Sequence, residues 1–548
     1  MQKIKIIIIL LLTIVACTPK EKFDILIING IIYDGSGSPG YIGDLGINSD
    51  TIAAIGSLSN SKAEAIIDAE GMAVSPGFIN MLSWATESLI EDGRSQSDIR
   101  QGVTLEVMGE GHSMGPLNES MKEEMIQDQG DLKFDITWTS LGEYLEYLES
   151  KGVSTNVASF IGNATVRQFV LDYETRPPDE EELERMRQLV REAMEEGAVG
   201  LSSALIYVPS SYASTQELIE LAKVVSDYDG MYISHLRNED DSLFKAMDEF
   251  FQVAHKANIR SEIYHFKASK KANWHKLDEA IRKIEEARNN GLYITTDMYM
   301  YPASSTGLNT VLPFWAIEGG IDKTIERFKD PVIRKKILNE ISFPCSPDSI
   351  LLVGFRFKEQ RHLTGQSLGQ IARDRNISPE EAVAELIVAD DSRIQSVFFS
   401  MSEKNVKKKI ALPFMSFCSD AGSIANEGVF LNSNPHPRTY GSFARLLGKY
   451  VRDEKIIPLE EAIRRLTFFP ASNLKISKRG LLKQGYYADI VIFDPEKIQD
   501  HSTFQEPHQY STGVLHVFVN GTQVLKDGEH TGLKPGRVVR GPGWKGND

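Results

Sequence analysis

The sequence predicts an α/β fold: a (β/α)8 barrel joined to a small β-sandwich that both ends of the chain build together. Strand-like apolar runs alternate in series with helical stripes through the middle of the chain, as in βαβ units around a parallel sheet. Short apolar runs separated by turn residues mark both ends. No G-x-G-x-x-G motif follows the first strand, which disfavours a doubly wound dinucleotide-binding sheet.

Length and composition are those of a globular protein with one large and one smaller domain. The chain has 548 residues, of which 41% are hydrophobic and 25% charged, close to the average for globular proteins. Its formal net charge is −16. A nucleic-acid partner is excluded, because binding to phosphates requires a basic surface.

The N-terminus, MQKIKIIIILLLTIVACTPK, has the pattern of an export signal. Two lysines precede an apolar run that is too short for an ordinary membrane span. Ile14–Cys17 resembles a bacterial lipobox, so we expect a signal peptide over 1–16, a lipidated Cys17 and a linker over 17–22. The protein would then be a lipoprotein anchored to the membrane, in the periplasm or at the cell surface. A plain signal peptide that happens to contain a cysteine is the alternative.

The next segment, residues 23–75, predicts the first part of the sandwich. Its apolar runs alternate with Asn-Gly, Gly-Ser and Asn-Ser-Asp turns, which is typical of β-hairpins. The same texture returns in GYYADIVIFDP and VLHVFVNGTQVLKDGEH, within residues 476–548. We therefore expect the barrel over 76–475. Only Cys345 and Cys418 remain after Cys17, too few for a disulfide framework, so stability must come from a hydrophobic core.

The spacing of apolar residues predicts the order of helices and strands in the barrel. EELERMRQLVREAMEEG places its apolar residues on one helical stripe, and Gly197 can end that helix. The elements expected after it are strand AVGLSSALIYV, helix QELIELAKVVSDY, strand MYISH, helix DSLFKAMDEFFQVAHKA, strand RSEIYHF, helix KLDEAIRKIEEARNNG and strand YITTDMY.

Polar residues fall at the ends of these strands, where a barrel carries its chemistry. His235 ends MYISH, His265 ends SEIYH, and Asp420 ends PFMSFCSD. Earlier, GVTLEVMGEGHS ends a strand with Glu110 and His112. Imidazoles and a carboxylate are ligands for Zn²⁺, with one position left for water. Each histidine alone could be a hydrogen-bonded core residue, but two at successive strand ends, with an aspartate later, favour a metal site.

Longer stretches resemble one family, the N-acyl-D-amino-acid deacylase (D-aminoacylase) family of the amidohydrolase superfamily, over roughly residues 22–540. They include ILIINGIIYDGSG, IDAEGMAVSPGFIN, GVTLEVMGEG, EGAVGLSSALIYVP, YISHLRNE, IYHFKASKKANW, TTDMYMYPASSTGL, CSDAGS, PHPRTYGSFARLLGKYV and RGLLKQGYYADIVIFDP. The resemblance implies a barrel of the metal-dependent hydrolase type with the two-ended sandwich. It also implies zinc and hydrolysis of the amide bond of N-acyl-D-amino acids.

The resemblance also implies roles for individual residues. His235 and His265 match the barrel histidines that bind zinc, and Asp420 matches the general base that deprotonates the metal-bound water and then protonates the leaving amine. The residues that match the contacts to the substrate carboxylate are Lys267, Tyr299, Ser305 and Arg438. A guanidinium fork and an ammonium both suit a carboxylate.

The chain departs from the family pattern at three places, two of which concern the metal site and the third Asn163. The His-x-His pair after PGFID is replaced by Leu82 and Trp84, so a second metal of the usual kind cannot be held there. GNCG is replaced by GEGH, with Gly111 in line with the cysteine. We therefore expect Glu110 as third ligand, with His112 as the alternative, and one zinc ion per chain.

Four residues complete the expected pocket. Asn163 stands where relatives tend to have histidine; it can orient or polarise a carbonyl but cannot shuttle protons. Trp84 and Leu82 would line a pocket for the acyl chain, and so would Tyr207, for which a packing role is equally expected.

The resulting hypothesis is a mononuclear zinc amidohydrolase for N-acyl-amino acids with a free carboxylate. A dipeptide or cyclic-amide hydrolase of the same superfamily is one alternative. A catalytically inactive surface lipoprotein that binds carboxylates is another, motivated by the missing histidine pair. The preferred acyl group and amino acid, the D or L stereochemistry apart from the resemblance, and the oligomeric state stay open.

Overall fold

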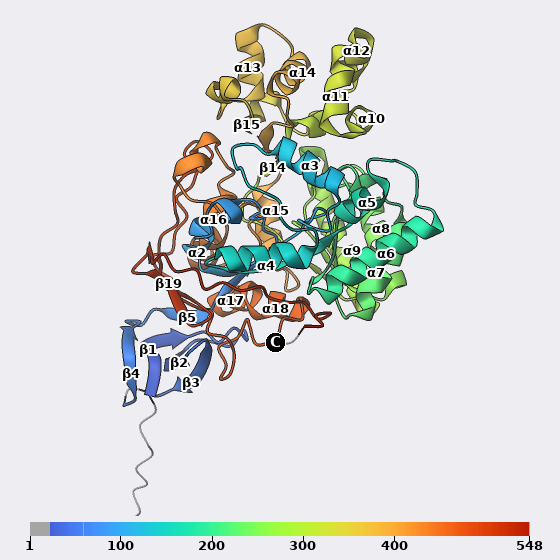
Figure 1. Ribbon diagram of the computed structural model, residues 1–548. Helices are drawn as coiled ribbons and strands as arrows, with labels where there is room; N and C mark the ends of the chain where they lie inside the picture. Colours follow the sequence, from blue (N-terminus) through green and yellow to red (C-terminus); the bar gives the residue numbers. More distant parts are fainter. Residues whose placement is uncertain (1–21, 59, 547–548) are drawn as a thin grey trace, which may run out of the picture.

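A computed structural model describes residues 22–58 and 60–546 of the chain (Figure 1). The predicted signal peptide and Cys17 lie outside these residues, so export and lipidation stay predictions. Within the described ranges, no helix has both the length and the apolar character needed to cross a membrane.

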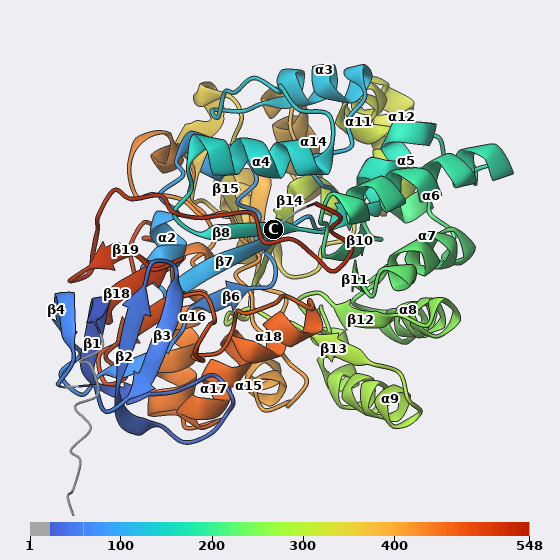
Figure 2. The ribbon, with the colours of Figure 1, turned by 60° about the horizontal axis from the view of Figure 1, so that its bottom comes forward.

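A ring of parallel strands forms the barrel, as predicted (Figure 2). One group pairs β6, β7 and β8, and a second pairs β9 to β13. The segment 415–421 closes the ring, because Met415 bridges to Thr296 and Ala421 to Ser83, both in parallel. The strand bounds are β6 Phe78–Asn80, β7 Val103–Met108, β8 Asn156–Ser159, β9 Ile161–Gly162, β10 Gly200–Ala204, β11 Met231–His235, β12 Arg260–Ile263 and β13 Ile294–Thr296.

Helices cover the outside of the ring, and α6 to α9 follow one another along one side in Figure 2. In α6 (Glu180–Glu195) the predicted apolar stripe is buried, and Asp179 and Glu182 form a capping box at its start. The other bounds here are α7 Thr215–Asp227, α8 Leu243–Ala257 and α9 Leu277–Asn289. Elsewhere they are α1 Ser88–Glu91, α2 Gln96–Ile99, α3 Glu119–Asp128, α4 Leu141–Lys151, α5 Asn163–Leu171, α15 Glu403–Ile410, α16 Arg438–Arg445, α17 Leu459–Leu466 and α18 Phe468–Asn473.

Both ends of the chain share one sheet, as predicted, with the order β20-β19-β18-β17-β5-β1-β2-β3 and β4 paired to β1. Its buried faces form a hydrophobic core that joins N-terminal residues such as Leu45 to C-terminal ones such as Ile490. The bounds are β1 Lys22–Ile32, β2 Tyr41–Asn48, β3 Thr51–Gly56, β4 Lys62–Asp68, β5 Ala73–Pro76, β17 Ile490–Phe493, β18 Val514–Val519, β19 Thr522–Lys526 and β20 Glu529–His530. Beyond β20 the chain returns to the barrel, where Val538 bridges to Val157 of β8.

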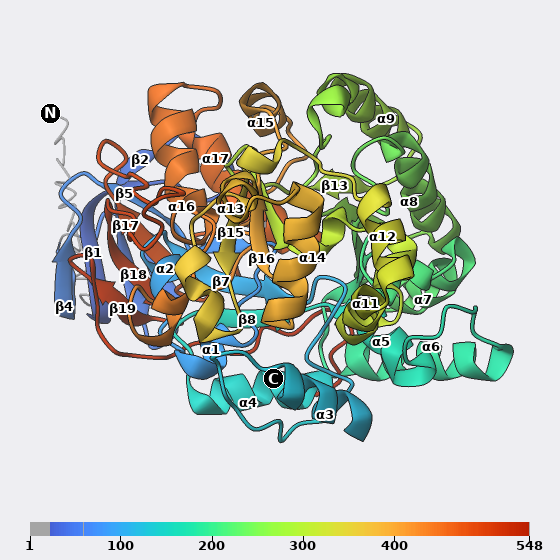
Figure 3. The same ribbon diagram turned by 90° about the horizontal axis from the view of Figure 1, so that it is seen from above.

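A further lobe, not anticipated from the sequence, interrupts the barrel over residues 304–398. It has its own three-stranded antiparallel sheet and a separate hydrophobic core that includes Leu352 and Leu386. The lobe stands at the top in Figure 1, and Figure 3 looks down on it. Its elements are β14 Ser304–Gly307, α10 Phe314–Ile317, α11 Gly320–Lys329, α12 Pro331–Glu340, β15 Ile350–Gly354, α13 Leu368–Arg375, α14 Pro379–Asp390 and β16 Gln395–Phe398.

Candidate metal centre and active site

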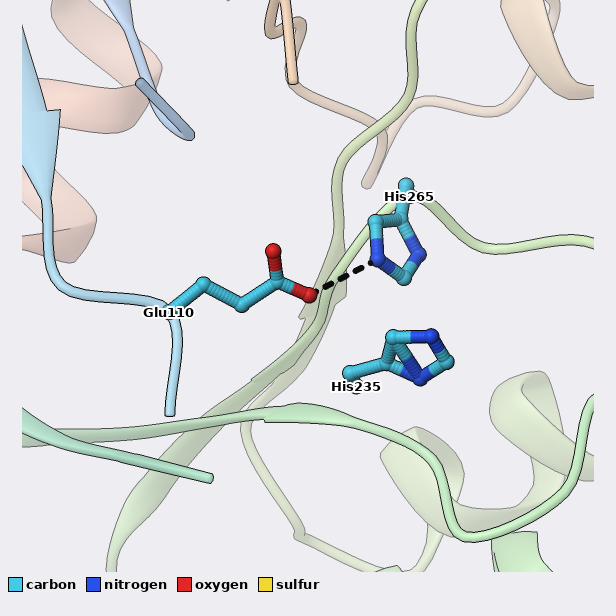
Figure 4. A group of neighbouring side chains, drawn as sticks. All are labelled: Glu110, His235 and His265. Atoms are coloured by element: carbon cyan, nitrogen blue, oxygen red, sulfur yellow. Dashed lines mark hydrogen bonds and ion pairs between the residues drawn. The ribbon is translucent and has the colours of Figure 1, made fainter. Parts of the chain in front are cut away.

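Three strand ends bring Glu110, His235 and His265 together (Figure 4). His235 is the last residue of β11, His265 follows the neighbouring β12, and Glu110 follows β7. Because β11 and β12 pair in parallel, their carboxyl ends meet at one mouth of the barrel. The two imidazole rings lie 4.5 Å apart between centroids and nearly perpendicular, at 83°.

The arrangement of these donor atoms fits a zinc ion. One donor atom from each residue lies within 4.8 Å of the others, and Glu110 Oε1 is 3.0 Å from His265 Nε2. Bonds of about 2.1 Å in a tetrahedral site place ligand atoms roughly 3.4 Å apart, so small side-chain shifts would suffice. All three residues are at least 95% buried, and two imidazoles with a carboxylate are a common zinc ligand set.

Electrostatics favours positive charge at His265, although burial lowers the pKa of His235 to about 4. Burial and the Lys267 ammonium lower the pKa of His265, but the carboxylates of Glu110 and Glu239 outweigh them and raise it to about 10. The carboxylates that stabilise a proton on this imidazole would equally stabilise a metal cation beside it.

Glu239 is a part of this cluster that sequence reasoning missed. Its Oε1 lies 2.6 Å from Lys267 Nζ and 3.3 Å from His265 Nδ1. Burial would raise the pKa of Glu239, but Lys267 and the two histidines hold it well below its usual range. A carboxylate against the second nitrogen of a ligating histidine fixes the orientation of the ring. The sequence feature that could have indicated Glu239 is its position four residues after His235, which ends a strand.

Gly111 explains why the ligand comes from the residue before it. Its φ is +66°, and an added Cβ would lie 2.5 Å from the Cβ of Ala204, so only glycine fits here. His112, the alternative third ligand, has an exposed side chain that lines the adjoining cavity, and it is not in the donor cluster.

Asp420 lies beside the cluster and forms an ion pair with Arg438. Its Oδ2 accepts a hydrogen bond of 2.6 Å from Arg438 Nη1, and its Oδ1 is 3.2 Å from the indole nitrogen of Trp84. The Arg438 guanidinium also stacks over the Tyr299 ring, 4.5 Å from the centroid. Burial raises the pKa of Asp420, although Arg438 opposes the rise.

A cavity of about 700 Å³ opens onto these groups. The residues predicted from the sequence that line it are Trp84, Glu110, Tyr207, His235, His265, Lys267, Tyr299, Ser305, Asp420 and Arg438. The inserted lobe contributes further lining through Arg393 and Gln395, which sequence reasoning did not single out.

Two predicted pocket residues lie elsewhere. Asn163 is fully buried outside the cavity lining, where it accepts a hydrogen bond of 2.7 Å from Ser210. Its amide therefore holds the turn after β10, and the predicted contact with a substrate carbonyl is wrong for this structure. Leu82 is also fully buried in the hydrophobic core and does not line the cavity, so it does not form part of an acyl pocket.

Comparisons with known proteins show which proteins this chain resembles. A model described as the amidohydrolase family matches residues 381–525. A D-aminoacylase of Alcaligenes xylosoxydans xylosoxydans is 31% identical over 528 residues, which cover 95% of this chain and 98% of that protein. The structure of N-acyl-D-glutamate deacylase from Bordetella bronchiseptica, complexed with zinc and a phosphonate inhibitor, is similar with a TM-score of 0.80 and 29% identity, covering 95% of this chain and all of that one.

A second similar structure is that of a D-aminoacylase with a binuclear metal center, described by one-metal activation and second-metal attenuation. The TM-score is 0.79 and the identity 30%, over 94% of this chain and all of the other.

Proposed function

Because the chain belongs to the D-aminoacylase family of amidohydrolases, we propose that it hydrolyses the amide bond of N-acyl-D-amino acids. The observation that supports this most strongly is the convergence of a three-ligand metal site, a buried aspartate and an arginine on one cavity. In this proposal Glu110, His235 and His265 hold one zinc ion per chain. Zinc supplies Lewis acidity that polarises a carbonyl and lowers the pKa of water.

Asp420 acts as the general base and then as the general acid. Its carboxylate lies at the cavity next to Glu110 and His265, and burial raises its pKa toward the range in which it can both accept and release a proton. It accepts the proton of the attacking water and returns it to the nitrogen of the leaving amine.

The substrate carboxylate is bound by the cationic side of the cavity. Arg438 offers a planar fork of donors, and Lys267 offers an ammonium. Tyr299 and Ser305, each with a hydroxyl, line the same cavity. Arg438 already pairs with Asp420. A substrate carboxylate bound to the same guanidinium would therefore hold the scissile amide beside the general base.

The acyl group would occupy the part of the cavity near Tyr207 and Trp84. Tyr207 is half-buried, with its ring 5.4 Å from that of His235. Its hydroxyl forms a hydrogen bond of 2.9 Å with Thr306 of the inserted lobe. The Tyr207 side chain is therefore held between His235 and the lobe.

A substrate panel tests the proposal. Zinc-loaded protein is assayed with matched N-acetyl-D- and N-acetyl-L-amino acids, dipeptides and a hydantoin, with Asp420→Asn as the inactive control. We expect turnover of the N-acetyl-D series and its loss in the variant. Hydrolysis of the hydantoin or the dipeptides alone would assign a different reaction, and tight binding without turnover would assign a binding protein.

For the cellular location we propose a lipoprotein attached through Cys17. The support is the sequence pattern of the first residues. Labelling with a radioactive fatty acid in a bacterial host, followed by membrane fractionation, tests it. The wild type should be labelled and sediment with membranes, and Cys17→Ser should be neither labelled nor retained.

A further inference from the structure

Trp84 places its one indole N–H between two carboxylates of the site. Nε1 lies 3.1 Å from Glu110 Oε2 and 3.2 Å from Asp420 Oδ1. Indole nitrogen can only donate, so its single hydrogen is shared between the two acids. One carboxylate belongs to the metal cluster and the other is the proposed general base.

Backbone pairing fixes this placement. The amide of Asp420 donates to Leu82 O at 2.9 Å, and the amide of Trp84 donates to Ala421 O at 3.0 Å. Ser83 and Ala421 form the parallel bridge that closes the barrel. Trp84 and Asp420 are therefore adjacent because the ring closes at this register, and the indole position does not depend on a flexible loop.

The other oxygens of both carboxylates are already occupied. Glu110 Oε1 faces His265 Nε2 at 3.0 Å, and Asp420 Oδ2 faces Arg438 at 2.6 Å. That leaves Glu110 Oε2 and Asp420 Oδ1 directed at the same indole. Two buried carboxylates facing one point repel each other unless a donor or a cation lies between them.

We propose that Trp84 is a positioning residue that takes the place of a second cation. This rests on the proposed hydrolysis. Its N–H holds Glu110 and Asp420 at a fixed separation and occupies the point toward which both carboxylates are directed, so one metal ion would suffice to organise the site. The site is therefore restricted to one metal, in contrast to the binuclear center of the similar D-aminoacylase.

Trp84→Phe tests the positioning, because it keeps an aromatic ring in the cavity and removes the N–H. We expect kcat to fall about ten- to hundred-fold and KM to stay within about threefold, because Arg438 and Lys267 are unchanged. Trp274→Phe is the matched control. It also removes an indole hydrogen bond, of 2.9 Å to Ser400 O, outside the cavity lining. Equal kcat in Trp84→Phe and Trp274→Phe would overturn the positioning role.

Zinc counting tests the exclusion of a second ion. Purified protein is saturated with zinc, freed of unbound metal and assayed by elemental analysis. The wild type should retain one ion per chain. Trp84→His, which offers an imidazole beside the two carboxylates, should retain a second. Two ions in the wild type, or one in Trp84→His, would overturn this half of the proposal.

A spectroscopic test does not depend on activity. The chain has five tryptophans, and with ¹⁵N-labelled tryptophan each indole N–H gives one resonance. The resonance that is missing in Trp84→Phe is assigned to Trp84. We expect that resonance to shift in both Glu110→Gln and Asp420→Asn. A resonance that moves in neither variant would refute the contact. If the contact is verified but no N-acyl substrate is turned over, the proposed function fails and the contact stands.

Discussion

Arg438 is proposed to serve two carboxylates, Asp420 and that of the substrate, and Arg438→Met separates the two. In the structure the Arg438 and Asp420 side chains are 6% and 9% exposed and 2.6 Å apart. Removing one partner of such a pair destabilises by about 3–5 kcal/mol. A hydrogen bond to a charged substrate group contributes about 1.5–3 kcal/mol, which is about ten- to 150-fold in kcat/KM.

The assay compares an N-acetyl-D-amino acid with its neutral carboxamide in the wild type and in the variant. The four values of kcat/KM form a cycle in which effects on Asp420 alone cancel. We expect the wild type to prefer the acid by about ten- to 150-fold, and Arg438→Met to lose most of that preference. Arg445→Met is the control, because it removes a charge from the same helix that pairs instead with Asp500 at 2.9 Å.

An equal effect of Arg438→Met on both substrates would contradict this prediction. If Arg438→Met slows both substrates by the same factor, Arg438 acts only through Asp420, and its assignment to the substrate carboxylate is refuted.

Three other predictions concern stability and the metal ligand. Burial and the charge of Asp297 raise the pKa of Glu262 to about 8 from 4.5. The folded state then holds a proton that the unfolded chain releases, so stability should fall as pH rises from about 5 to 8, by at most about 1.4 kcal/mol per pH unit. Thermal unfolding should show this, with a smaller fall in Glu262→Gln; equal pH dependence in both would contradict it. Gly111→Ala should weaken zinc binding by moving Glu110, and unchanged affinity in a zinc titration would count against it. Glu217→Ala leaves the fully buried Arg167 without its ion-pair partner at 2.5 Å. The free energy of unfolding in urea should therefore fall by about 3–5 kcal/mol, and a loss below about 1 kcal/mol would contradict this.

The sequence predicted those features that depend on local periodicity. The stripe of α6 is an example, because an apolar residue every three or four positions specifies both the helix and the face it buries. His235 and His265 were identifiable for a related reason: each ends a short apolar strand, and parallel strands bring their carboxyl ends to one mouth. The two-ended sheet followed from the same turn chemistry at both ends of the chain.

Features that depend on contacts between distant residues were not predictable. The lobe over 304–398 has helices and strands of ordinary pattern, and only its separate core distinguishes it from the barrel. The indole of Trp84 meets Asp420, 336 positions away in the chain, through the closure of the ring. Asn163 has a polar side chain at a strand end, yet its neighbour Ser210 turns it away from the cavity.

Zinc titration of metal-free protein by calorimetry tests whether Glu110, His235 and His265 form the metal site. We predict one tightly bound ion per chain in the wild type, and loss of that binding in Glu110→Ala, His235→Ala and His265→Ala. His255→Ala, which removes an exposed histidine of α8, should bind zinc as the wild type does. Absence of zinc binding in the wild type, or wild-type affinity in all three ligand variants, would show that these residues do not hold a zinc ion.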